Sequence, residues 1–178
     1  MIEFKGTTIC AVKKDGKTAI AGDGQVTAGE KYVVKSNAVK VRRIFDDKVV
    51  AGFAGSTADA FAFIEKFEKI QKKYSGNLMR ASVELAQDWR SGKVQRDLQA
   101  QMIVADAEHM FLLTGVGDVI EPENDVLEIG SGGPYAKAAA LALLQNTKLS
   151  AKEIARKAIE IAGSMCVFTN NHITVEEV

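Results

Sequence analysis

The sequence predicts a single α+β domain in which two layers of β-sheet are covered by pairs of helices. The chain has 178 residues, enough for one domain with a substantial core. Its apolar pattern runs in the order strands, two helices, strands, two helices, strands. Separate blocks of strands and helices favour sheets that pack face to face beneath helical layers.

A hairpin opens the first block of strands. Thr7–Val12 is rich in β-branched residues, and Thr18–Gly22 is the expected return strand. Between them stands Asp15-Gly16, a pair typical of a type I′ turn, whose two central residues both need positive φ.

More strands follow before the first helix. We expect Tyr32–Lys35 and Ala38–Phe45 to form a second strand pair. Asp46-Asp47 then turns the chain into Val49–Ala54. That segment is apolar on both faces, which predicts a strand inside a sheet.

Helical spacing begins at Ser56, where apolar residues recur every three or four positions as far as Tyr74. Ser56 with Asp59 resembles a capping box. Gly76-Asn77 breaks the chain, and Leu78–Trp89 is the second expected helix.

The second half repeats the alternation. Pro134, after a glycine-rich segment, suits the first turn of a third helix. Ser150 with Glu153 forms a full capping box for a fourth, which should run to about Met165. Strands are expected at Ala100–Ala105, Met110–Thr114 and Val126–Ile129, and again over Val167–Val178.

Composition excludes several classes of protein. Lys plus Arg and Asp plus Glu both number 23, so nothing indicates a general affinity for nucleic acid or an anionic membrane. Two cysteines, Cys10 and Cys166, cannot build a disulfide framework, which predicts a reducing, cytoplasmic compartment. Two histidines without close Cys/His spacing argue against zinc. No apolar stretch approaches a membrane span, and Met1–Gly6 lacks the apolar core of a secretory signal.

Three features differ from an ordinary core. Thr7-Thr8 opens a strand after a short polar leader, Gly22-Asp23-Gly24 places a carboxylate at a strand end, and Gly52–Ser56 and Gly130–Gly133 are glycine-rich exits into helices. Glycine lets main-chain N–H groups face a ligand. Each feature alone is more often a turn, a cap or plain β-propensity. Nucleotide binding is disfavoured, because neither a P-loop ending nor a GxGxxG motif is present.

Together, the order and spacing of these segments resemble the HslV (ClpQ) family, the proteasome-like peptidase subunits of a bacterial two-component ATP-dependent protease. The resemblance covers the chain from Thr7 to its end and implies a four-layer αββα sandwich of the N-terminal-nucleophile hydrolase type. The segments that carry it include Thr7-Thr8-Ile9, Ala21–Thr27, Lys40–Arg43, Ala51–Gly55, Ile129–Tyr135 and Cys166–Asn170.

The resemblance also implies catalytic roles. Thr7 would attack the scissile carbonyl and its α-amine would take the proton. Lys40 would stabilise the alkoxide, Asp23 would hold Lys40, the Gly52 N–H would bind the oxyanion, and Ser131 would lie near the Thr7 amine.

An amide nitrogen cannot act as the base, so residues 1–6 are expected to be a propeptide and residues 7–178 the peptidase domain. The stretch Gly29–Lys35 is one residue longer than in relatives. Alignment on Val41-Arg42-Arg43 therefore selects Lys40, with Lys35 as the other candidate.

A sodium site is a further implication of the resemblance, through the main-chain carbonyls of Gly163, Cys166 and Thr169. Helix ends leave carbonyls unpaired and hard cations take oxygen ligands, although a helix C-terminus with a buried cysteine has the same spacing.

The partners implied are copies of the chain itself, a homododecamer of two stacked hexameric rings, and the hexameric ATPase HslU (ClpY), which would feed unfolded protein substrates to the Thr7 sites. Two alternatives stay open: a self-standing N-terminal-nucleophile amidase, and a catalytically silent scaffold subunit.

Overall fold

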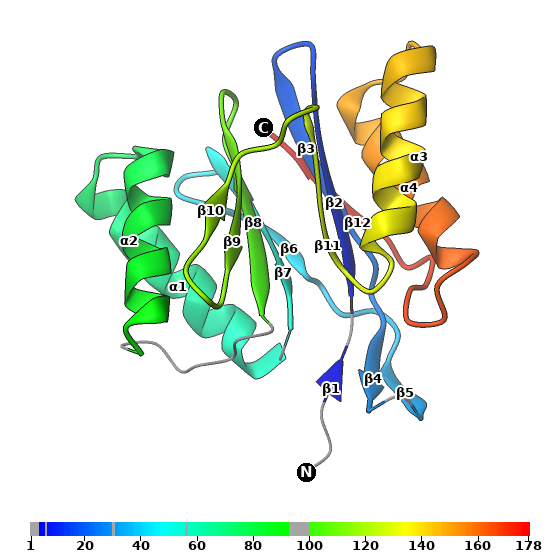
Figure 1. The fold of residues 1–178 in the computed structure, drawn as a ribbon, viewed down its shortest axis with the longest axis horizontal. Coiled ribbons are helices and arrows are strands. Elements are labelled where there is room, and N and C mark those ends of the chain that lie inside the picture. Colours follow the sequence, from blue (N-terminus) through cyan, green and yellow to red (C-terminus); the bar gives the residue numbers. More distant parts are fainter. Residues whose placement is uncertain (1–3, 6, 30, 56, 93–99) are drawn as a thin grey trace.

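The computed structural model describes residues 4–5, 7–29, 31–55, 57–92 and 100–178. Two antiparallel sheets stand face to face between two pairs of helices (Figure 1). This arrangement confirms the predicted α+β class and the four-layer αββα order. No helix in the described ranges is both long and apolar enough to cross a membrane.

The four-stranded sheet has the order β11-β2-β3-β12 and is covered by α3 and α4. Its hairpin has the predicted turn, since Asp15 and Gly16 have φ values of 52° and 75°. The elements are β2 (Thr8–Lys14), β3 (Lys17–Gly22), β11 (Val126–Gly130), β12 (Thr174–Glu177), α3 (Gly133–Asn146) and α4 (Ala151–Gly163). The predicted Ser150–Glu153 capping box is present at the start of α4.

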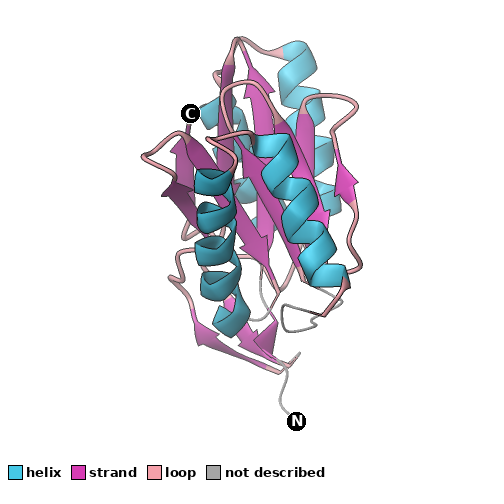
Figure 2. Cartoon of the chain, turned by 90° about the vertical axis from the view of Figure 1, so that its left-hand side faces the viewer, coloured by secondary structure: helices cyan, strands magenta, loops and turns pink. Residues whose placement is uncertain are grey.

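The five-stranded sheet has the order β10-β9-β8-β7-β6. Figure 2 shows α1 and α2 side by side across its outer face. The elements are β6 (Val41–Ile44), β7 (Val49–Ala54), β8 (Gln101–Ala105), β9 (Met110–Thr114), β10 (Val119–Ile120), α1 (Thr57–Lys73) and α2 (Leu78–Arg90). As predicted, β7 lies inside the sheet and is buried along its whole length. The predicted cap at Ser56 lies outside the described residues.

The core has three apolar layers, of which the middle one joins the two sheets. Ile9 and Ile20 of the four-stranded sheet lie in this middle layer with Val50 and Ile103 of the other. Gly52 makes the close approach possible, because a Cβ there would lie 2.8 Å from Ile9 Cγ2 and 3.2 Å from Ile20 Cγ2.

A small third sheet lies at one end of the molecule (Figure 1), with the order β1-β4-β5. Its strands are β1 (Phe4–Lys5), β4 (Val26–Ala28) and β5 (Tyr32–Lys35). The prediction that Tyr32–Lys35 pairs with Ala38–Phe45 was wrong: β5 pairs with β4, and β6 pairs with β7. A three-residue strand such as β4 is too short to give a periodic signal.

The final segment also differs from its prediction. Only Thr174–Glu177 of the expected strand Val167–Val178 belongs to a sheet. The residues before it form turns, with the Thr169 N–H donating to the Cys166 carbonyl at 3.1 Å. β-Branched residues favoured a strand, but these local bonds bring the chain from α4 back to β3.

Candidate active site

Thr7 stands at the start of β2 and is 3% exposed. Its φ of 136° is unusual for a β-branched residue and indicates a strained main chain. The Thr7 carbonyl accepts the Ser131 N–H at 3.0 Å. Gly130, with φ of 88°, allows this contact, since a Cβ there would lie 1.8 Å from the Thr7 oxygen.

Asp23 follows β3 and its carboxylate is almost completely buried. Oδ1 accepts the Thr8 N–H at 2.9 Å and the Lys40 ammonium at 3.0 Å. Oδ2 accepts the N–H groups of Gln25 at 2.9 Å and Asn170 at 3.2 Å. Four donors thus fix the orientation of the carboxylate and satisfy its charge.

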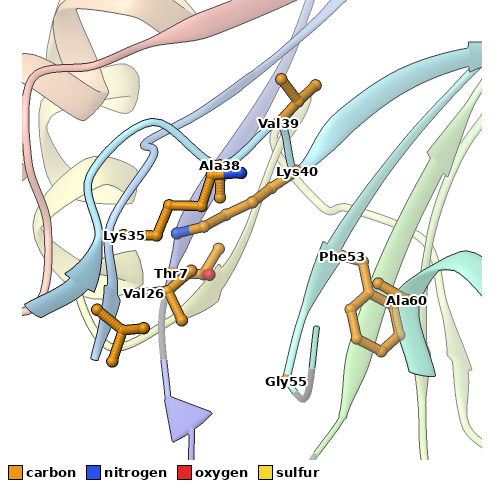
Figure 3. A pocket seen from close by; sticks show the side chains of 10 residues that line it. Thr7, Val26, Lys35, Ala38, Val39, Lys40, Phe53, Gly55 and Ala60 are labelled. Carbon is orange, nitrogen blue, oxygen red and sulfur yellow. The ribbon is translucent and has the colours of Figure 1, made fainter. Parts of the chain in front are cut away.

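Lys40 immediately precedes β6, and its side chain is 5% exposed. Its ammonium donates to Asp23 and, at 2.5 Å, to the Gln25 carbonyl. Burial lowers the pKa of Lys40 from its ordinary 10.5, and the neighbouring Asp23 charge works against that fall. In Figure 3 the Lys40 side chain is directed towards Thr7.

A cavity of about 330 Å³ opens beside Thr7 (Figure 3). Apart from two lysines and Thr7 itself, its walls are apolar or glycine. They are formed by Thr7, Val26, Val34, Lys35, Ala38, Val39, Lys40, Phe53, Gly55 and Ala60. An apolar side chain therefore fits next to the threonine hydroxyl.

The structure brings Thr7, Asp23 and Lys40 together, and Ser131 joins them through its main chain. Lys35 also borders the cavity, but in Figure 3 its ammonium lies towards Ala38. Across the described ranges, no hydrogen bond or ion pair involves the Lys35 side chain.

Gly52 is not at the cavity. It lies within β7, opposite Val41 of β6 and Ile103 of β8. The main-chain N–H groups of such an interior strand donate hydrogen bonds to the neighbouring strands. The glycine that does border the cavity is Gly55, whose φ is 140° and whose Cβ, if present, would lie 3.0 Å from Ala100 Cβ.

Gly163, Cys166 and Thr169 lie where α4 ends and the chain turns back. Carbonyls at a helix C-terminus lack partners within the helix, which suits a hard cation. The segment folds tightly over the helix end, since a Cβ on Gly163 would lie 2.7 Å from Asn171 Oδ1. Within the described ranges, no group of three or more His, Cys, Asp or Glu side chains could hold a metal.

Three site residues received no role from the sequence: Thr8, Gln25 and Asn170. The Thr8 hydroxyl accepts the Gly132 N–H at 2.9 Å and shares a 2.6 Å hydrogen bond with the Thr169 hydroxyl. Asn170 reaches Asp23 across 147 positions of the chain. Local patterns carry no signal for contacts over such separations.

Comparison with known proteins agrees with this geometry. A family model described as "Proteasome subunit" matches residues 3–178. ATP-dependent protease subunit HslV of Treponema denticola is 58% identical, covering 99% of this chain and 98% of that protein. The same subunit of Listeria welshimeri is 59% identical, with 99% of each chain covered.

Among solved structures, the crystal structure of eukaryotic HslV from Trypanosoma brucei superposes with a TM-score of 0.89 at 48% identity. The superposition covers 96% of this chain and 98% of that one. The chain therefore belongs to the proteasome family of threonine peptidases and, within it, to the HslV protease subunits.

The lowered pKa of Lys40 leads to a prediction about pH. The folded protein should release the Lys40 proton at a lower pH than the unfolded chain, where the pKa is 10.5. Between these two pKa values the unfolded state binds more protons, so the contribution of Lys40 to the free energy of unfolding rises with pH. In a ¹³C NMR titration of the lysines, assigned with Lys40→Arg, Lys40 should have a midpoint below 10.5. A midpoint at or above that value would contradict the burial argument.

Proposed function

We propose that this chain is a threonine-type endopeptidase, the proteolytic core of a two-component ATP-dependent protease that degrades unfolded proteins. The observation that supports this most strongly is the buried Lys40–Asp23 pair beside Thr7 at the edge of an apolar cavity. Burying an ion pair carries a desolvation cost, so this pair points to a functional role. A nucleophilic hydroxyl needs a neighbouring cation and base.

The reaction begins with Thr7. Its Oγ attacks the scissile carbonyl while the Thr7 α-amine accepts the hydroxyl proton, and an ester to Thr7 Oγ replaces the peptide bond. The amine then returns the proton to the leaving nitrogen, and water hydrolyses the ester. A free α-amine titrates near 7.7–8.0, which suits a general base at neutral pH.

Lys40 stabilises the negative charge that develops on Thr7 Oγ, and Asp23 holds the ammonium in place. The oxyanion of the tetrahedral intermediate needs an N–H donor at the cavity. We assign this role to Gly55, the glycine that borders the cavity with Thr7, in place of Gly52 inside β7. Losing such a donor typically costs ~10²–10³ in turnover. Ser131 positions Thr7 through its main-chain bond to the carbonyl.

Residues 1–6 act as a propeptide. Their removal must give residues 7–178 a free α-amine at Thr7. The strained φ of Thr7 supports self-cleavage, because the φ constraint disappears when the preceding peptide bond breaks. In that step Thr7 Oγ attacks the Gly6 carbonyl, which lies outside the described residues. The Gly6–Thr7 C–N bond breaks as the hydroxyl proton passes to the Thr7 nitrogen, and water then hydrolyses the resulting ester to release residues 1–6.

The propeptide also indicates how substrates bind. β1, which ends two residues before the nucleophile, pairs antiparallel with β4 and places Lys5 opposite Thr27. Loss of residues 1–6 exposes this edge of β4. An extended polypeptide can add to it as a strand, with one side chain in the apolar cavity.

The carbonyls of Gly163, Cys166 and Thr169 would hold a sodium ion, which would supply a fixed positive charge at the turn after α4. The turn contacts the active site through the hydrogen bond between the Thr169 and Thr8 hydroxyls.

Assembly into two stacked hexameric rings is supported by apolar side chains left exposed on a single chain. On β5, Tyr32, Val33 and Val34 are 57%, 51% and 50% exposed, and Val167 is 79% exposed. Such surfaces are usually covered by a partner. The relatives' name, ATP-dependent protease subunit, supports a partner ATPase. We propose that this partner is the hexameric ATPase HslU and that the complex acts in the cytoplasm.

Substitutions at three residues test the assigned roles. Thr7→Ala should abolish peptide hydrolysis, and Thr7→Ser should retain measurable activity because a hydroxyl remains. Lys40→Ala should lower kcat by roughly 10²–10³, the range for loss of one group that stabilises developing negative charge. Lys35→Ala is the matched control and should keep kcat near wild type. If Lys35→Ala were inactive and Lys40→Ala active, the assignment of the lysine would be reversed.

The proposed partner ATPase leads to another prediction. Activation requires the ATPase to bind the active arrangement more tightly than the resting one. Hydrolysis of a short fluorogenic peptide should be weak with this chain alone and rise strongly as ATP-bound HslU is titrated. A chain that stayed monomeric and ran at its maximal rate alone would instead be a self-standing amidase.

A further inference from the structure

The Asn170 side chain links two segments, at Gly24 and at Ser36, that both lie far from it in the sequence. Its Oδ1 accepts the N–H groups of Gly24 and His172, both at 3.1 Å. Its Nδ2 donates to the Ser36 carbonyl at 2.8 Å. The same residue's main-chain N–H donates to Asp23 Oδ2 at 3.2 Å. Both the oxygen and the nitrogen of this amide thus have main-chain partners.

The two linked segments are the ones that form the site. Gly24 lies next to the catalytic carboxylate. Ser36 lies between Lys35 and Ala38, which both line the cavity. The two segments touch directly, because a Cβ on Gly24 would lie 2.5 Å from the Ser36 oxygen. The Ala38 N–H also donates to the Gly24 carbonyl at 2.9 Å.

Residues 36–39 are exposed or half-buried, and the wall is otherwise held at its end by Lys40, whose carbonyl accepts the Phe53 N–H at 3.2 Å. Ser36–Lys40 belongs to no strand, and the apolar residues on both sides of Ser36, Val34 and Val39, are exposed. A segment with few buried contacts and no sheet partner depends on individual hydrogen bonds for its position.

We propose that Asn170 is a positioning residue whose side chain acts as a clamp: it holds the Asp23–Gly24 segment against the cavity wall. Asp23 and Lys40 then keep a fixed position relative to the substrate side chain in the cavity. This inference rests on the proposed peptidase function. One arm of the clamp, through Oδ1, acts on the catalytic carboxylate. The other arm, through Nδ2, acts on the cavity.

Two variants separate the arms. Asn170→Asp retains an acceptor for Gly24 and His172 but places an oxygen against the Ser36 carbonyl, so it releases only the cavity wall. KM for a peptide with an apolar side chain should rise about tenfold, the factor that loss of one well-placed hydrogen bond can give, while kcat changes less. Asn170→Ala releases both arms, and kcat should fall as well, by about tenfold to a hundredfold.

His172→Ala is the matched control, since it keeps the main-chain N–H that binds Asn170 and removes only an exposed side chain. Hydrogen exchange measured by mass spectrometry adds a readout that does not depend on activity. Exchange over residues 24–40 should be faster in both Asn170 variants than in His172→Ala or wild type.

The outcomes are distinct. Unchanged exchange over residues 24–40 in Asn170→Ala would overturn the clamp, as would equal effects of Asn170→Asp and Asn170→Ala on KM and kcat. If Asn170→Ala does not fold, Asn170→Asp still decides through its KM and exchange. If wild type hydrolyses no peptide with or without HslU, the proposed function fails, and hydrogen exchange alone tests the clamp.

Discussion

The ion pair between Lys40 and Asp23 is the interaction on which the site depends. Both groups are removed from water, which is unfavourable unless every polar atom finds a partner. Here the carboxylate takes four donors and the ammonium takes two acceptors. The donors come from β2, from the segments after β3 and before β6, and from the turn after α4, so the whole fold must be in place before the pair is satisfied.

The two-sheet architecture explains how those segments meet. β2 and β3 carry Thr7 and Asp23 to one end of the four-stranded sheet, and Lys40 immediately precedes β6 at the edge of the other. Gly52 lets the two sheets pack closely against each other at Ile9 and Ile20. Gly52 thus supports the site from within the core. Gly55, which follows β7 in the sequence, lines the cavity.

Periodicity and turn chemistry, which are local properties, predicted the two sheet layers, the hairpin with its turn and both helix pairs, whereas the trio Thr7, Asp23 and Lys40 was implied by the resemblance to the HslV family. Sequence reasoning did not predict β4, which is three residues long, or the turns after α4, where local bonds outweigh β-propensity. Gly52 was assigned to the oxyanion because both it and Gly55 belong to one glycine-rich motif. Only the sheet register separates a glycine inside a strand from one at a cavity. Asn170 acts over contacts that no local pattern encodes.

The central claim is that Thr7 works only as the first residue of the chain. An electrophilic peptide probe that forms a covalent bond with the nucleophile tests this most directly when combined with intact mass measurement. Every labelled chain should have lost the mass of residues 1–6, and Thr7→Ala should remain unlabelled. Labelled chains that still begin at Met1 would contradict the account, because their Thr7 nitrogen is an amide and cannot serve as the base.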